Sequence, residues 1–77
     1  MKEILELIIK NLVDDAEAVS IQEKTNDDKS VSYEVQVTKD DMGKVIGKQG
    51  KMAKSIRSVI NAIAIKEHVR VNVEFIG

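Results

Sequence analysis

Apolar residues near the start of the chain recur every three or four positions, which is the period of an amphipathic helix. This pattern predicts a helix over about residues 2–14 that ends near Asp14 and Asp15. Charges at Glu3 and Glu6 interrupt the apolar run, so it reads as a helix of a folded domain and not as a signal peptide or membrane span. Its apolar face is expected to comprise Ile4, Leu5, Ile8, Leu12 and Val13.

The pattern then changes to strict alternation, which indicates strands with one buried face. A short alternating stretch at residues 19–22 is followed by a polar turn at residues 25–30 and a longer alternating stretch at residues 31–38. These segments predict a hairpin with one face in water. Alternation returns over residues 69–75 and predicts a closing strand.

Two helices are expected between the hairpin and the closing strand. Asp40 is placed to cap a short helix that runs through Ile46, and Asp41 lies near its positive end. Gly47 ends that helix, and a longer helix runs on to about Lys66. Its buried stripe is expected to comprise Met52, Ile56, Val59, Ile60 and Ile63.

The predicted order of elements is α-β-β-α-α-β, an α+β fold. Because each strand has one apolar face, three helices should cover one face of a three-stranded sheet while the other face meets water. The chain has 77 residues and no linker, so residues 1–77 are expected to form a single domain. The lack of cysteine fits a reducing cytoplasm and excludes thiolate metal sites.

Charge is distributed unevenly along the chain although the formal net charge is only −1. Residues 1–38 carry 4 lysines and 9 acidic residues, whereas residues 39–57 carry 6 basic residues and 2 aspartates. Electrostatic attraction is screened over about 8 Å at physiological salt, so a phosphate responds to the nearby basic segment and not to the acidic remainder. A local anion-binding region is therefore expected within residues 39–57.

The centre of this basic segment is the tetrapeptide Gly47-Lys48-Gln49-Gly50, followed by the start of the longer helix. Glycine lacks the Cβ atom that would hold a polyanion away from the main chain, and it permits turns that other residues avoid. The helix start supplies free N–H groups and a positive dipole end. This setting favours binding of a phosphate backbone.

The stretch Val45-Ile46-Gly47-Lys48-Gln49-Gly50-Lys51-Met52-Ala53-Lys54-Ser55-Ile56 resembles the KH signature of Ile-Gly-x-x-Gly followed by an apolar residue six positions on. The order α-β-β-α-α-β resembles the type II form of that domain. Since the resemblance covers essentially all 77 residues, the chain is most similar to the KhpA family of small stand-alone KH proteins.

The resemblance implies that about four nucleotides of single-stranded RNA lie between the two central helices and a sheet edge, with the Gly-x-x-Gly loop clamping their backbone. With only Tyr33 and Phe75 as aromatics, stacking contributes little and sequence preference should be loose. The apolar Ile56 is a further candidate for the groove. The expected RNA-binding residues are Lys44, Val45, Ile46, Gly47, Lys48, Gln49, Gly50, Lys51, Ala53, Lys54 and Arg57.

Partners are also implied by the resemblance. KhpA-like proteins are associated with a larger RNA-binding partner, KhpB (also called Jag or EloR), as an RNA chaperone pair that influences cell-wall growth and cell length. One small clamp binds weakly, and two joined clamps raise the effective concentration, so a homodimer or a heterodimer with such a partner is expected.

Other functions find less support in the residues. A protein–protein adaptor that uses the KH fold for dimerisation, with RNA bound mainly by the partner, is the main alternative. Residues 43–48 fail as a P-loop because only three residues separate their glycines. No acid–base pair accompanies His68 or the helix serines, so we expect no enzyme, catalytic residue, cofactor, metal site, small-molecule substrate or membrane contact.

Overall fold

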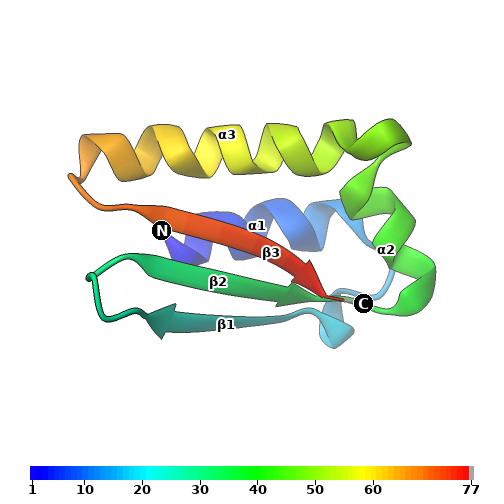
Figure 1. The fold of residues 1–77 in the computed structure, drawn as a ribbon. Coiled ribbons are helices and arrows are strands. Elements are labelled where there is room, and N and C mark those ends of the chain that lie inside the picture. Colours follow the sequence, from blue (N-terminus) through cyan, green and yellow to red (C-terminus); the bar gives the residue numbers. More distant parts are fainter. Residues whose placement is uncertain (77) are drawn as a thin grey trace.

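The computed structural model describes residues 1–76 and contains three α-helices and three strands in the predicted order α-β-β-α-α-β (Figure 1). The α+β fold is therefore confirmed. Two short 3₁₀ turns, η1 at Ala16–Ala18 and η2 at Lys48–Gly50, separate α1 from β1 and α2 from α3. The main elements are α1 (Lys2–Leu12), β1 (Ser20–Thr25), β2 (Val31–Gln36), α2 (Lys39–Ile46), α3 (Lys51–Lys66) and β3 (Val71–Ile76).

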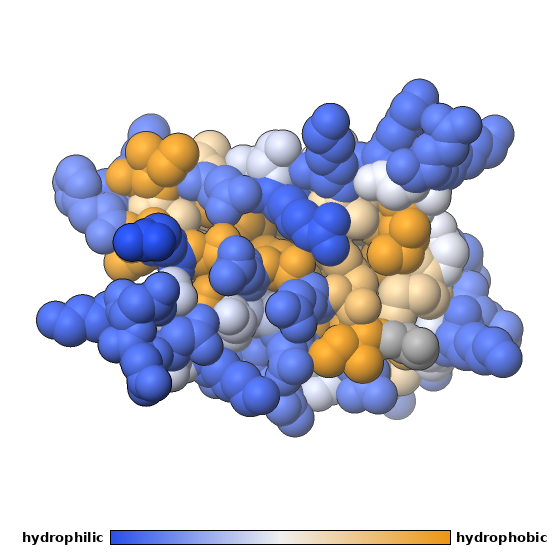
Figure 2. All heavy atoms as spheres, viewed as in Figure 1, coloured by the Kyte–Doolittle hydropathy of each residue, from blue (hydrophilic) through white to orange (hydrophobic). Residues whose placement is uncertain are grey.

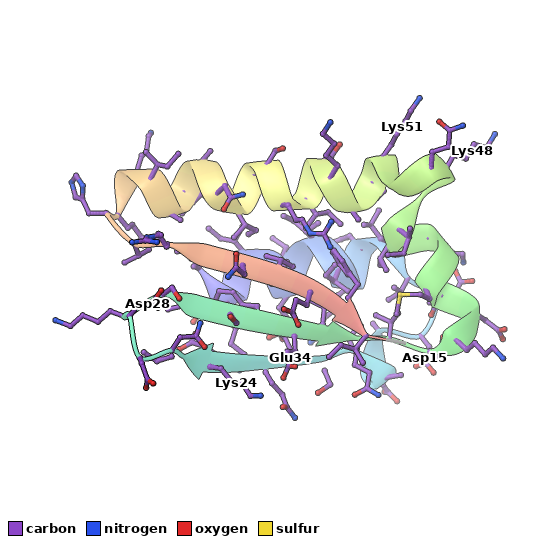
Figure 3. All side chains as sticks on the ribbon, viewed as in Figure 1. Asp15, Lys24, Asp28, Glu34, Lys48 and Lys51 are labelled. Carbon is purple, nitrogen blue, oxygen red and sulfur yellow. The ribbon has the colours of Figure 1, made fainter. Side chains whose placement is uncertain are left out.

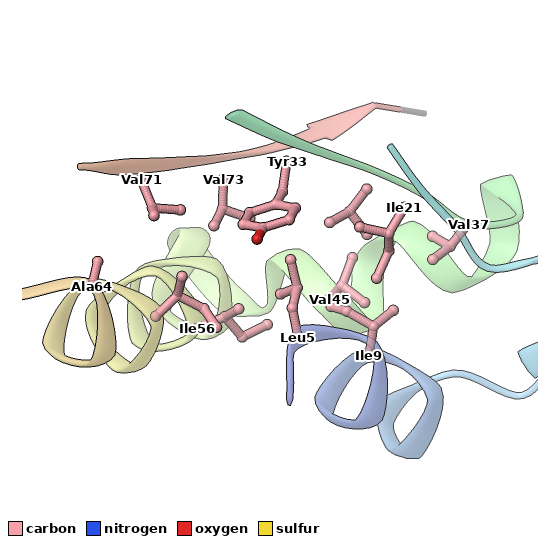
Figure 4. Close-up of a cluster of buried hydrophobic side chains, with 12 residues drawn as sticks. Leu5, Ile9, Ile21, Tyr33, Val37, Val45, Ile56, Ala64, Val71 and Val73 are labelled. Carbon is pink, nitrogen blue, oxygen red and sulfur yellow. The ribbon is translucent and has the colours of Figure 1, made fainter. Parts of the chain in front are cut away.

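The sheet is mixed, with strand order β1-β2-β3. The hairpin partners β1 and β2 are antiparallel, whereas β3 returns after the two central helices and pairs with β2 in parallel. The helices cover one face of the sheet (Figure 4). As a result β3 is an edge strand, and α3 runs beside it (Figure 1).

The core lies between the sheet and the three helices (Figure 4). Alternate residues of the strands point into it, as the sequence pattern predicts. Its largest fully buried side chains are Leu5, Ile9, Val35, Val45 and Ile60. Burying side chains of this kind contributes roughly 1.5–3 kcal/mol each.

The buried stripe of α3 differs from the predicted one. Met52 is 37% exposed and Val59 is 47% exposed, so neither belongs to the core. The buried positions of this helix are Ala53, Ile56, Ile60 and Ala64. The exposed Met52 and Val59 each precede a buried residue of this helix, Ala53 and Ile60, and a rotation of about 100° per residue takes them out of the core. Ile4 of α1 is likewise 41% exposed.

The start of α2 also corrects a prediction. The cap is Thr38 and not Asp40, because the Thr38 hydroxyl accepts a hydrogen bond from the Asp41 N–H at 3.2 Å. Asp41 itself is buried, and its carboxylate accepts hydrogen bonds from the backbone N–H groups of Asp14 at 3.2 Å and Asp15 at 3.0 Å. One aspartate thus fastens the segment after α1 to the helix that leads into the glycine loop.

Candidate nucleic-acid interface

The loop between α2 and α3 has a backbone that requires glycine at both ends. Gly47 has φ 74° and ψ 179°, and Gly50 has φ 75° and ψ 12°. Between them Gln49 also has a positive φ of 57°, which a residue with a side chain seldom adopts. Three positive φ angles in four residues turn the chain sharply from α2 into α3.

The space around Gly47 is also too small for a side chain. A Cβ atom built there would lie 2.7 Å from the Met52 Cβ and 2.9 Å from the Met52 backbone nitrogen. A Cβ atom at Gly50 would meet nothing within 4 Å. Gly47 is therefore needed for the close approach of the loop to α3, whereas the Cα of Gly50 faces open space.

The loop leaves main-chain donors available. The Gly47 N–H donates to the Gly43 carbonyl at 2.9 Å, and the Gly50 N–H donates to the Gly47 carbonyl at 3.3 Å. Within residues 1–76, the N–H groups of Lys48 and Gln49 form no hydrogen bond. These two amides remain free for an external acceptor such as a phosphate oxygen.

Ammonium groups surround these amides. Figure 3 shows the Lys48 and Lys51 side chains extending from the same end of α3 into solvent. Both lysines are exposed, as is Lys54 one turn further along the helix. Since α3 begins at Lys51, the free N–H groups and the positive dipole end of the helix lie beside these charges. The arrangement suits a chain of phosphates.

Arg57 extends the basic surface along the sheet edge. Its Nε donates a hydrogen bond to the Val73 carbonyl of β3 at 3.0 Å, and its guanidinium lies 5.3 Å from the centre of the Phe75 ring. The face of the aromatic ring attracts the guanidinium cation, and the hydrogen bond fixes the orientation of the Arg57 side chain. The terminal nitrogens of Arg57 form no other hydrogen bond among the described residues.

Lys44 has a different environment from the other lysines. Its ammonium group forms an ion pair with Asp14 and lies 3.7 Å from Asp41. The hydrogen bond with Asp14 raises the pKa of Lys44 above its ordinary value. This lysine is bound within the protein and is less available to a phosphate than the sequence suggests.

The apolar residues predicted for the groove are divided between core and surface. Val45 is fully buried, and Ala53 and Ile56 are 2% and 3% exposed, so these side chains face the sheet. Ile46 is half-buried, and part of its side chain reaches the surface beside the loop. The predicted residues that are exposed or half-buried in the loop and on the flanking α2 and α3, apart from Lys44, are therefore Ile46, Gly47, Lys48, Gln49, Gly50, Lys51, Lys54 and Arg57.

Comparison with known proteins gives the family. A family model described as "KhpA/KhpB, KH domain" matches residues 2–75. The chain belongs to the KhpA/KhpB family of KH domains. Similar proteins include the RNA-binding protein KhpA of Clostridium acetobutylicum, at 53% identity over 99% of this chain and 100% of the relative. The RNA-binding proteins KhpA of Clostridium perfringens and Caldanaerobacter subterraneus are 51% and 46% identical, each over 99% of this chain and 100% of the relative.

Membership in the KhpA/KhpB family makes this a binding protein and not an enzyme. Over residues 1–76, no group of three or more histidine, cysteine or acidic side chains is placed to hold a metal ion. In the same part of the chain, no helix has the length and apolar character needed to cross a membrane.

The sequence did not reveal the roles of Phe75 and Thr38. Phe75 was identified as a strand residue and as one of two aromatics, but its contact with Arg57 depends on how α3 packs on the sheet. Thr38 carried a usable signal, since Thr38-x-x-Asp41 is a capping pattern that places the cap three residues before the acid.

Proposed function

We propose that this protein, residues 1–77 acting as one KH domain, binds single-stranded RNA. The Gly47–Gly50 loop holds the sugar–phosphate backbone through its free amides, and exposed lysines supply charge. Bases lie between Ile46 and the edge of β3, where Arg57 is anchored. The observation that carries the proposal is the pair of unbonded N–H groups at Lys48 and Gln49 beside Lys51. The names of the KhpA relatives, which describe RNA binding, support it.

Charge reversal in the loop tests the clamp. The double substitution Lys48→Asp and Gln49→Asp places two carboxylates beside the free amides and should abolish crosslinking to single-stranded RNA. Both side chains are exposed, so urea unfolding should change little. Crosslinking at the wild-type level in a folded double variant would refute the clamp.

A matched control changes the same charges elsewhere. Lys24→Asp together with Gln22→Asp alters the net charge by the same amount, at exposed positions on β1. This strand forms the edge of the sheet away from β3 and α3 (Figure 1). RNA crosslinking by this control should stay near the wild-type level because its charges are beyond the screening distance of about 8 Å.

We also propose that the protein acts as a homodimer and as a heterodimer with a KhpB (Jag/EloR)-like protein. Large apolar side chains remain exposed on two helices and support this proposal: Leu7 on α1 is 64% exposed, and Val59 on α3 is 47% exposed. Two joined clamps raise affinity without new contacts. Light scattering after gel filtration tests it, and monomers alone at tens of micromolar, with or without that partner, would contradict it.

In the cell, we propose a cytoplasmic RNA chaperone that influences gene expression, cell-wall growth and cell length together with its partner. This proposal follows the family resemblance. Sequencing of RNA crosslinked in cells, with and without the loop substitutions, tests it. Identical bound RNAs in both strains would contradict a role for this chain in selecting or holding the RNA.

The same exposed apolar residues favour a second candidate function, a protein–protein adaptor whose partner supplies the RNA contacts. The loop variant separates the two. If Lys48→Asp with Gln49→Asp keeps RNA crosslinking but loses partner binding, the adaptor function is supported and the clamp is refuted.

A further inference from the structure

We propose a second nucleotide site, beyond the glycine loop, in a hollow between the C-terminal half of α3 and the start of β3. This site rests on the proposed function, because its occupant is a later nucleotide of the strand that the loop holds. The hollow has a volume of about 390 Å³, within the range of roughly 300–1,000 Å³ for small-molecule sites. We call it the α3–β3 hollow, lined by Asn61, Ala64, Ile65, Val69, Arg70, Val71 and Asn72.

The α3–β3 hollow is continuous with the surface around the glycine loop. Arg57 and Asn61 are four residues apart on α3, so they lie on the same side of the helix, one above the other. Arg57 is tied to Val73 of β3, and the hollow includes Val71 two residues earlier on that strand. The same helix and the same strand edge therefore border both places. Figure 2 shows apolar side chains along this boundary with hydrophilic ones crossing it.

The hollow lies within the length of a short RNA strand that is held at the glycine loop. Asn61 follows Gly50 by eleven residues, which is about 16 Å along an α-helix. A stacked strand rises about 3.4 Å per nucleotide, so four nucleotides cover about 14 Å. A strand that is clamped at the glycine loop and follows α3 reaches the hollow with its fifth or sixth nucleotide.

The residues that line the hollow match the chemistry of a nucleobase. Ala64, Ile65 and Val69 provide an apolar floor against which the face of a base can pack. The side-chain amides of Asn61 and Asn72 are exposed and form no hydrogen bond within residues 1–76. A carboxamide offers a donor and an acceptor side by side, which matches the edge of a base, adenine above all.

Charge also favours a nucleotide over a protein segment. Arg70 lines the hollow, and none of the acidic residues within residues 1–76 does. The Arg70 guanidinium can pair with a phosphate, the apolar floor can contact the face of a base, and the two free amides can form hydrogen bonds with its edge.

The test compares RNA of two lengths. Random-sequence RNA pools of four and of eight nucleotides are titrated against the wild-type protein and against the double variant Asn61→Ala with Asn72→Ala, with NMR to follow binding. The quantity is the ratio of variant to wild-type dissociation constants for each pool. A long RNA can bind in several registers, but the wild-type protein and the variant are titrated with the same pool. The number of registers therefore cancels in the ratio of their dissociation constants.

We expect a ratio near one for the short pool and of about tenfold for the long pool, as for the loss of one stacked and hydrogen-bonded base. In the wild-type protein, only the long pool should shift the side-chain amide resonances of Asn61 and Asn72. The control variant Gln22→Ala with Gln36→Ala, which removes two exposed carboxamides from β1 and β2, should give ratios near one for both pools.

Equal ratios for the two pools in a folded variant would overturn the second site while leaving the clamp intact, since short RNA would still bind. If the wild-type protein binds neither pool, the clamp and the second site both fail. If the double variant keeps its affinity for long RNA and instead loses self-association in light scattering, the hollow is a protein contact and the nucleotide site is refuted.

Discussion

Substitution of the two loop glycines by alanine should have unequal effects on stability. Gly47 and Gly50 have nearly the same φ, 74° and 75°, so a comparison based on φ alone predicts similar costs. Their ψ angles and surroundings differ. Gly47 has ψ 179°, in a region that only glycine adopts readily, and its missing Cβ would lie 2.7 Å from the Met52 Cβ. Gly50 is in the left-handed helical region with open space around it.

The expected magnitudes follow from these two differences. Gly50→Ala should cost about 1–2 kcal/mol, the usual penalty for a side chain in the left-handed region. For Gly47→Ala the backbone penalty is about 1–3 kcal/mol, and the overlap with Met52 adds about 1–3 kcal/mol, as for an overpacked core site. A domain of this size has only a few kcal/mol of net stability, which is comparable to the summed cost of Gly47→Ala. This variant should therefore be largely unfolded at room temperature.

Urea unfolding followed by circular dichroism measures both costs on the same scale. Thermal unfolding provides a second reading, because 1 kcal/mol shifts Tm by about 4–8 °C in a domain of 60–100 residues. If the two variants have equal stability, or if Gly47→Ala remains within about 1 kcal/mol of the wild type, the reasoning from Met52 is wrong.

Three other predictions concern charge and titration. The backbone N–H groups of Asp15 and Asp14 hold the pKa of Asp41 below its ordinary value. The contribution of Asp41 to stability is therefore complete above about pH 4 and is lost as the pH falls through the pKa of the folded state. In the variant Asp41→Asn, the free energy of unfolding should fall less steeply at acid pH. Burial raises the pKa of the sole tyrosine, Tyr33, to about 12, so ultraviolet titration of the folded protein should show ionisation there, and a midpoint near 10 would contradict its burial. If Lys48, Lys51 and Lys54 neutralise about three phosphates, log affinity for single-stranded RNA should fall with log salt at a slope near −2, which Lys44→Ala should leave unchanged.

The order of elements was predictable because it depends on local periodicity. Alternation over residues 31–38 and 69–75 identified β2 and β3, and each glycine-bounded helix was recognised from its spacing. The strand predicted over residues 19–22 is shorter than β1, which continues to Thr25, because the later positions of β1 are polar and show no alternation. Pairing across strands extends that element beyond what its own sequence indicates.

The side chains at the interface were less predictable than the loop that carries them. Gly47 and Gly50 stand out in sequence because their backbone needs are local. The burial of Val45 and the ion pair of Lys44 with Asp14 depend instead on how α2 meets the segment after α1, thirty residues earlier in the chain for that pair. Sequence spacing cannot distinguish a lysine that faces solvent from one that meets a distant carboxylate.

The position of Arg57 has a consequence for how the protein behaves when concentrated. The outer rim of a sheet is a template on which a strand from another molecule can add, the first step toward fibres. In β3 the Val73 carbonyl already accepts a hydrogen bond from the Arg57 Nε, and this bond interrupts the row of acceptors that an incoming strand would need. A shorter residue at position 57 would reopen that row, so resistance to aggregation and attraction for RNA are tied to one side chain.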